Sequence, residues 1–94
     1  MEFTAPDSTD SFYTIYGKTD CTYCVKVKYL LTSFNEPYTY INCDEYILND
    51  KEAFLKYIKE LAGKEHKTFP IVFRDMKLIG GYTDTYKLLL EKYE

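Results

Sequence analysis

Residues 18–24 read Lys-Thr-Asp-Cys-Thr-Tyr-Cys and separate Cys21 from Cys24 by two residues. The stretch follows a run typical of a β-strand and begins a run typical of a helix. A Cys-X-X-Cys pair at such a junction indicates a thiol redox site. Because the first helical turn offers unpaired backbone N–H groups and the positive end of the dipole, we expect the pKa of Cys21 to lie below the free value of about 8.5. Cys24, one turn further along the same helix face, is expected to be within reach for a disulfide.

Two other interpretations of the cysteine pair stand beside this one. A structural zinc site requires four ligands, and the remaining candidates, Cys43 and His66, are not paired in the sequence. The two thiols could also be purely structural. We favour the redox interpretation and expect no protein-held metal. Cys43 is expected to be a buried small hydrophobic residue, with a regulatory thiol as the alternative, and His66 is assigned no role.

Composition narrows the class of protein. The 94 residues suffice for one domain, and 46% hydrophobic with 29% charged residues is typical of a globular chain. A net charge of −3 argues against nucleic acid as the main partner. No run approaches the ~18 apolar residues of a membrane span, and the first residues lack the features of a signal peptide. Three cysteines also fit a disulfide-stapled secreted domain poorly. We therefore expect a cytoplasmic monomer in a reducing setting, without nucleic acid or membrane partners.

Hydrophobic periodicity predicts the element order β-α-β-α-β-β-α. Strands are expected at 12–17, 38–43, 69–74 and 77–79, the last two joined by a turn at 75–76. Helices are expected from the cysteine pair to about Asn35, over 51–62 after an Asp50 cap, and after a Thr83 cap. Residues 44–49 are expected to be a loop. The chain divides into a loose, flexible N-terminal arm at 1–11 and one folded domain at 12–94.

The strand–helix–strand unit around the cysteine pair makes the first two strands parallel, and the short turn makes the last two antiparallel. The expected fold class is therefore α/β, with a four-stranded mixed sheet flanked by about three helices.

Three motifs in this order resemble a dithiol glutaredoxin of the thioredoxin-fold superfamily, over about residues 12–93. They are the stretch at 18–24, Thr68-Phe69-Pro70, and Gly80-Gly81-Tyr82-Thr83-Asp84. The resemblance implies a glutathione-dependent oxidoreductase that reduces protein disulfides and glutathione mixed disulfides. It implies a nucleophilic Cys21 and a resolving Cys24.

The resemblance also implies a glutathione site. Lys18 and Lys67 would contact the glycine carboxylate, and Pro70 would be a cis-proline that exposes the backbone of Phe69 to the cysteinyl part. The other residues implied in the site are Tyr23, Thr68, Gly81, Thr83 and Asp84. Thr83 would bind the γ-glutamyl carboxylate through its N–H at a helix start, and Asp84 the ammonium.

Three positions depart from the family pattern. Thr22 replaces the usual proline and leaves open a glutathione-ligated [2Fe–2S] cluster that bridges two subunits through Cys21. Asp20 would raise the pKa of Cys21 and thus oppose Lys18. Phe69 replaces a valine and is expected to change the groove width. A further alternative is a redoxin, reduced by a thioredoxin-reductase-type enzyme, that donates electrons to ribonucleotide reductase.

Overall fold

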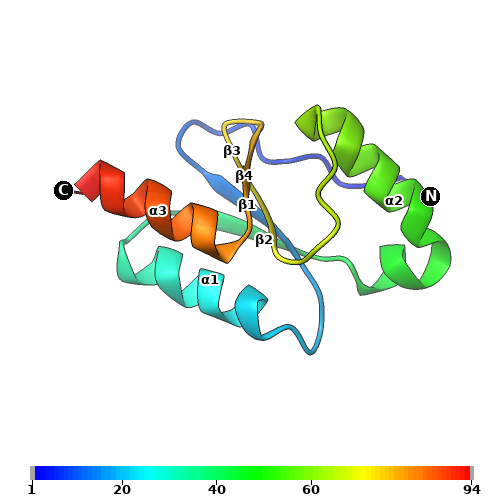
Figure 1. The fold of residues 1–94 in the computed structure, drawn as a ribbon, viewed down its shortest axis with the longest axis horizontal. Coiled ribbons are helices and arrows are strands. Elements are labelled where there is room, and N and C mark those ends of the chain that lie inside the picture. The colour runs from blue at the N-terminus through cyan, green and yellow to red at the C-terminus, as the bar shows by residue number, and fades with distance from the viewer. Residues whose placement is uncertain (1, 94) are drawn as a thin grey trace.

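A computed structural model describes residues 2–93; Met1 and Glu94, which the sequence analysis assigns to the arm and the domain, lie outside them. The chain forms the predicted order of four strands and three helices (Figure 1). The elements are β1 (Tyr13–Gly17), α1 (Thr22–Ser33), β2 (Tyr38–Asn42), α2 (Asp44–Ala62), β3 (Ile71–Arg74), β4 (Lys77–Gly80) and α3 (Tyr82–Tyr93). No helix among these residues is long and apolar enough to cross a membrane.

The sheet is mixed, in the order β2-β1-β3-β4. As predicted, β1 pairs with β2 in parallel and β3 pairs with β4 antiparallel. The hairpin turn at Asp75 and Met76 has positive φ at both residues, which matches the twist of the flanking strands. β1 also pairs antiparallel with β3, so the cysteine-bearing half and the hairpin half share one sheet.

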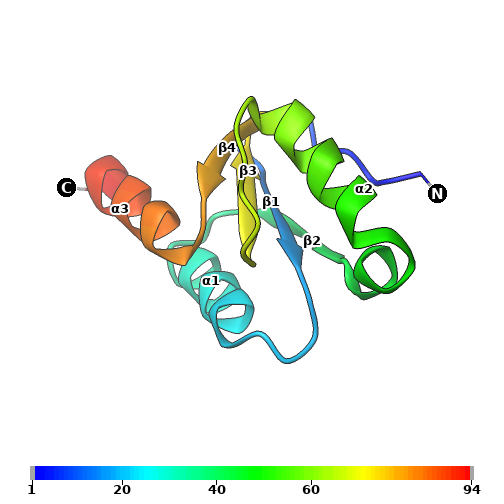
Figure 2. The ribbon, with the colours of Figure 1, turned by 45° about the vertical axis from the view of Figure 1, so that its right-hand side comes forward.

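Alternating side chains of the central strands divide the core into two layers. Figures 1 and 2 show α1 and α3 on one face of the sheet and α2 on the other. The first layer contains Tyr13, Ile15, Val27, Leu31, Val72 and Leu89. The second contains Tyr16, Cys43, Phe54, Ile58, Ile71 and Phe73. Because neighbours along β1 and β3 point to opposite faces, each central strand contributes to both layers.

The structure corrects the predicted loop at 44–49, which is the first part of α2. The Asn42 carboxamide accepts a hydrogen bond from the Asp44 N–H at 2.8 Å, and two acidic residues, Asp44 and Glu45, stand in the first turn. Asp50 then interrupts the helix with φ −163° and ψ 80°. Its carboxylate accepts a hydrogen bond from the Ala53 N–H at 3.1 Å, so it caps the second part as predicted.

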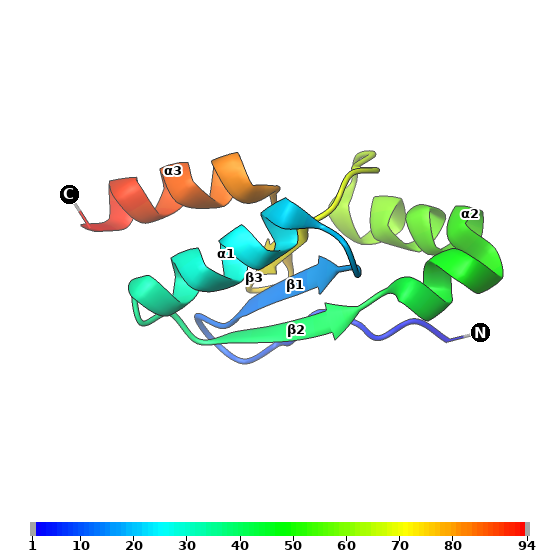
Figure 3. The ribbon, with the colours of Figure 1, turned by 90° about the horizontal axis from the view of Figure 1, so that it is seen from below.

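The N-terminal arm lacks regular secondary structure, but it is packed where the sequence predicts a loose segment. The Phe3 ring lies 5.0–5.4 Å, centroid to centroid, from the rings of Tyr46, Phe54 and Tyr57. The Tyr16 hydroxyl donates to the Thr4 carbonyl at 2.7 Å. In Figure 3 the arm passes the sheet and runs toward α2. Phe3, a hydrophobic residue in an otherwise polar segment, therefore packs against the second layer of the core.

The helix α3 begins at Tyr82, two residues earlier than a Thr83 cap predicts. Thr83 lies inside the helix and is not its cap. The Gly81 carbonyl accepts from the Thr85 N–H at 3.1 Å and from the Thr85 hydroxyl at 2.8 Å. The Asp84 carboxylate reaches back to the Gly81 N–H at 3.4 Å. The Thr83 N–H therefore belongs to the first turn, where helical amides have no intrahelical acceptor.

Candidate functional site

Cys21 and Cys24 form a disulfide at the start of α1, with their Cα atoms 5.2 Å apart. Cys21 is the N-cap residue, and its Sγ accepts a hydrogen bond from the Cys24 N–H at 3.2 Å. Cys24 is buried, whereas Cys21 is partly exposed. The outer sulfur is thus the one that a disulfide in solution can reach, and a thiolate there would meet the free amides of the first helical turn.

A groove runs along one side of this disulfide, between the cysteine pair, the segment before β3 and the start of α3. The bond between Phe69 and Pro70 is cis, as the resemblance implied. Seven of the residues that the resemblance placed in a glutathione site line this groove: Tyr23, Thr68, Phe69, Pro70, Gly81, Thr83 and Asp84. Three segments far apart in the sequence therefore meet beside the reactive pair.

His66 and Tyr82 also line the groove, although the sequence analysis gave neither a role. The Nε2 atom of His66 is buried and has no hydrogen-bond partner among the described residues. The Tyr82 ring lies 5.7 Å from the Tyr23 ring and continues the aromatic wall. Their positions in the sequence could have placed both residues at the groove, because His66 directly precedes Lys67-Thr68-Phe69-Pro70 and Tyr82 lies within the glycine-rich motif.

The two predicted lysines lie outside this groove. Lys18 lines a second hollow on the other side of Cys21, with its Nζ 5.7 Å from the centroid of the Phe69 ring. Lys67 lies next to the groove in sequence, but its Nζ is 3.7 Å from a Glu65 carboxylate oxygen, and it lines a separate hollow beside α2. Both partners of that ion pair are exposed, so it holds Lys67 only weakly.

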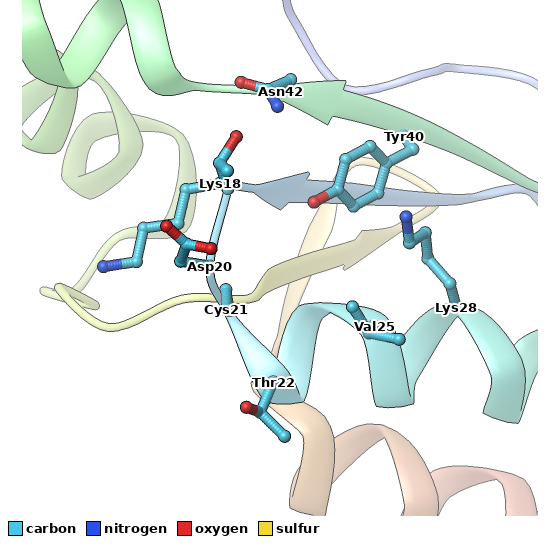
Figure 4. Close-up of a pocket in the computed structure, with 9 residues that line it drawn as sticks. Lys18, Asp20, Cys21, Thr22, Val25, Lys28, Tyr40 and Asn42 are labelled. Atoms are coloured by element: carbon cyan, nitrogen blue, oxygen red, sulfur yellow. The ribbon is translucent and has the colours of Figure 1, made fainter.

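Asp20 and Thr22, the two positions beside the cysteines that depart from the family pattern, both line the second hollow (Figure 4). Thr22 is exposed at its edge, and Asp20 projects into it beside Lys18. Cys21 therefore has one acidic and one basic neighbour on the same side, while the groove lies on the other.

Cys43 is buried in the second core layer, as expected. Burial, together with the neighbouring Asp44 carboxylate, raises the pKa of this thiol to about 12. No group of three or more His, Cys, Asp or Glu side chains within residues 2–93 is arranged to hold a metal ion. A cluster held through Cys21 would thus need ligands from outside the chain.

Comparison with known proteins agrees with this architecture. The family model described as glutaredoxin matches residues 13–79. Glutaredoxin 1 of Rickettsia typhi is 38% identical over 74 residues, which cover 79% of this chain and 66% of that protein. The mitochondrial glutaredoxin-2 of Homo sapiens is 31% identical over 80 residues, which cover 85% of this chain and 46% of that protein. The chain thus spans about half to two thirds of the length of these curated relatives.

Solved structures show the same fold. Glutaredoxin 1 from Francisella tularensis, complexed with cacodylate, superposes with a TM-score of 0.75 at 23% identity, covering 87% of this chain and 95% of that one. A buckwheat glutaredoxin–glutathione complex superposes with a TM-score of 0.71 at 26% identity, covering 90% and 73%. The sheet and its three helices are therefore a thioredoxin-like fold. Because the glutaredoxin model matches well over half of the sequence, this chain belongs to the glutaredoxin family.

Proposed function

We propose that this protein is a glutathione-dependent thiol–disulfide oxidoreductase that reduces protein disulfides and glutathione mixed disulfides. The observation that carries the proposal is the groove beside the Cys21–Cys24 disulfide, which joins Tyr23, the cis-Pro70 segment and the start of α3. The similarity to a glutaredoxin whose structure is a complex with glutathione supports the choice of ligand.

The charges along the groove suit a tripeptide with two carboxylates and one ammonium. The first turn of α3 presents the Thr83 N–H, a donor for the γ-glutamyl carboxylate, and the exposed Asp84 carboxylate for the neighbouring ammonium. The Phe69 backbone, next to the cis bond, is available to pair with the cysteinyl part, since Phe69 lies outside the strands of the sheet. The buried Nε2 of His66 adds a polar atom in need of a partner.

In the same proposal, Lys18 and Lys67 bind the glycine carboxylate of glutathione. Lys18 is exposed, and its position over the Phe69 ring brings its ammonium to the edge of the groove. Lys67 would have to leave Glu65, which costs little because the pair is exposed to solvent.

The reaction is an exchange of sulfur–sulfur bonds. The Cys21 thiolate attacks the glutathione sulfur of a mixed disulfide, the protein thiol leaves with its electron pair and takes up a proton, and a Cys21–glutathione disulfide remains. A second glutathione thiolate then releases oxidised glutathione and regenerates the Cys21 thiolate. With an intramolecular protein disulfide, Cys21 attacks one sulfur and Cys24 resolves the mixed disulfide. That step forms the Cys21–Cys24 bond of the structure, which two glutathione molecules reduce.

The test is reduction of a mixed disulfide between glutathione and a small thiol, coupled to glutathione reductase. Cys21→Ser should abolish turnover, whereas Cys24→Ser should retain substantial activity because glutathione replaces the resolving thiol. Full activity of Cys21→Ser, or turnover with thioredoxin reductase but none with glutathione, would overturn the proposal.

A further inference from the structure

The hollow on the far side of Cys21 from the groove is not used by the proposed glutathione site, apart from Lys18 at its end. Its walls come from the loop after β1, the first turns of α1 and the outer strand β2 (Figure 4). Its lining residues are Lys18, Thr19, Asp20, Cys21, Thr22, Val25, Lys28, Tyr40 and Asn42. A substrate segment attached to the leaving sulfur of a mixed disulfide would meet this surface once the glutathione half fills the groove.

Three lysines of the segment at 18–28, which contains Cys21, each hold their ammonium group over an aromatic ring. The Nζ atoms of Lys18, Lys26 and Lys28 are 5.7, 4.9 and 4.2 Å from the ring centroids of Phe69, Tyr23 and Tyr40, respectively. None of the three belongs to an ion pair in the part of the chain that the structure describes. An aromatic ring attracts a cation without neutralising its charge. Lys26 and Lys28 are therefore held in place and remain available to carboxylates of a protein partner, whereas Lys18 is assigned to glutathione.

The segment that carries Cys21 differs in the sign of its net charge from the whole molecule. Residues 18–35 contain three lysines and one acidic residue, Asp20, in a chain whose net charge is −3. The nearby Asp44 carboxylate accepts hydrogen bonds from the N–H and hydroxyl of Thr19 and lies outside the lining of the hollow. A positive surface on an acidic protein steers an acidic partner to one site and weakens its binding elsewhere.

The wall that faces Lys28, formed by Tyr40 of β2, is fixed by close packing. A Cβ atom on Gly17 would lie only 2.1 Å from the Tyr40 hydroxyl oxygen, so the Tyr40 ring lies directly against the backbone at the end of β1. Figure 4 shows the Lys28 ammonium facing this ring, with Lys18 at the other end of the hollow and Cys21 between them. The two lysines thus stand on opposite sides of Cys21 in this view.

We propose that Lys28 in the lining of this second hollow, together with Lys26 over the Tyr23 ring, selects protein substrates whose target cysteine is flanked by acidic residues. The inference rests on the proposed oxidoreductase function and adds its substrate class. Lys26 and Lys28 act as specificity-determining residues, outside the cysteine pair and the glutathione groove.

The experiment compares three synthetic peptides, each as a mixed disulfide with glutathione, in which the cysteine is flanked by Glu, Gln or Lys on both sides. For the wild type, kcat/KM should fall in the order Glu, Gln, Lys. The double variant Lys26→Gln/Lys28→Gln should lose about threefold to tenfold in kcat/KM for the Glu peptide, as expected for two exposed charge pairs, and little for the Gln peptide. Raising the ionic strength should remove the preference of the wild type.

The matched control is Lys51→Gln/Lys56→Gln on α2, which changes net charge equally on the opposite face of the sheet. It should keep the wild-type preference. Equal kcat/KM for the three peptides in the wild type, or an equal loss in both double variants, would overturn the inference. Either result leaves turnover of the Gln peptide measurable, so it is distinguishable from failure of the oxidoreductase proposal, in which no peptide is reduced.

Discussion

Gly80, the last residue of β4, adopts an unusual backbone conformation and leaves room for the groove residue Asp84. Its replacement by alanine tests both of these roles. Its φ is +133°, a conformation that residues with a Cβ rarely adopt. A Cβ atom there would lie 2.2 Å from the Asp84 Oδ2 and 2.8 Å from its Cγ. Gly80→Ala therefore strains the turn into α3 and displaces the carboxylate that we assign to the glutathione ammonium.

The two effects have different magnitudes and different assays. A residue held in such a backbone region costs about 1–3 kcal/mol, and the displaced Asp84 adds roughly 1 kcal/mol. We expect the free energy of unfolding to fall by about 2–4 kcal/mol, measured by urea denaturation of the oxidised protein. The KM for glutathione should rise severalfold in the glutathione-reductase-coupled assay, because one charge-assisted contact is weakened.

Gly63→Ala is the control for the backbone effect alone. Gly63 follows α2 with φ +75°, and a Cβ there would meet no atom within 4 Å. We expect a loss of about 1 kcal/mol and an unchanged KM for glutathione. If Gly80→Ala matched this control in both stability and KM, the reasoning about Asp84 would be refuted.

Three further predictions concern other parts of the molecule. Glu36 is buried, and it accepts hydrogen bonds from the Lys92 ammonium at 2.6 Å and the Tyr93 hydroxyl at 2.5 Å. Burial acts to raise the pKa of Glu36, but these hydrogen bonds lower it on balance, so its contribution to stability is present above the unfolded pKa of about 4.3 and is lost as pH falls through the folded pKa. Glu36→Gln should cost about 1–3 kcal/mol at pH 7 in urea denaturation, with a deficit that shrinks below about pH 4; a deficit independent of pH would contradict this account. Because Cys24 and Cys43 are both buried, and burial raises the pKa of Cys43 to about 12, iodoacetamide at pH 7 should rapidly alkylate only Cys21 of the reduced native protein and all three thiols after denaturation; fast alkylation of Cys43 in the native protein would contradict this account. Phe3→Ala should lower the melting temperature by about 4–15 °C through lost ring contacts, whereas an unchanged value would mean that the arm contributes nothing to stability.

The order of elements was predictable because each element carries its own local signal. The apolar stripe of α1, which buries Val27 and Leu31, follows helical spacing, and Gly63 ends α2 in the left-handed conformation that glycine favours. The three motifs at 18–24, 68–70 and 80–84 also predicted which segments meet at the groove. That prediction depended on the resemblance, since contacts between residues 23, 70 and 84 leave no periodic trace in one sequence.

The errors arose where tertiary contacts outweighed local composition. Asp44 and Asn49, at the two ends of the predicted loop, favour turns, yet Tyr46 between them contacts the Phe3 ring and the segment is helical. The polar residues of the arm predict a loose segment. Phe3, which anchors the arm, is a single apolar residue and therefore produces no periodic pattern. The role of Lys67 stays a prediction, because its side chain lies on an exposed loop and pairs there with Glu65.

The packed arm and the groove share a chain of aromatic rings. Phe54 contacts Phe3 at 5.4 Å and lies parallel to the Phe69 ring at 6.3 Å, with 9° between their planes. Residue 3 is thus two ring contacts away from the cis-proline segment. Anyone who shortens the arm, or attaches an affinity tag there, alters the support beneath Phe69. Engineering of the first residues therefore calls for a binding measurement as well as a stability measurement.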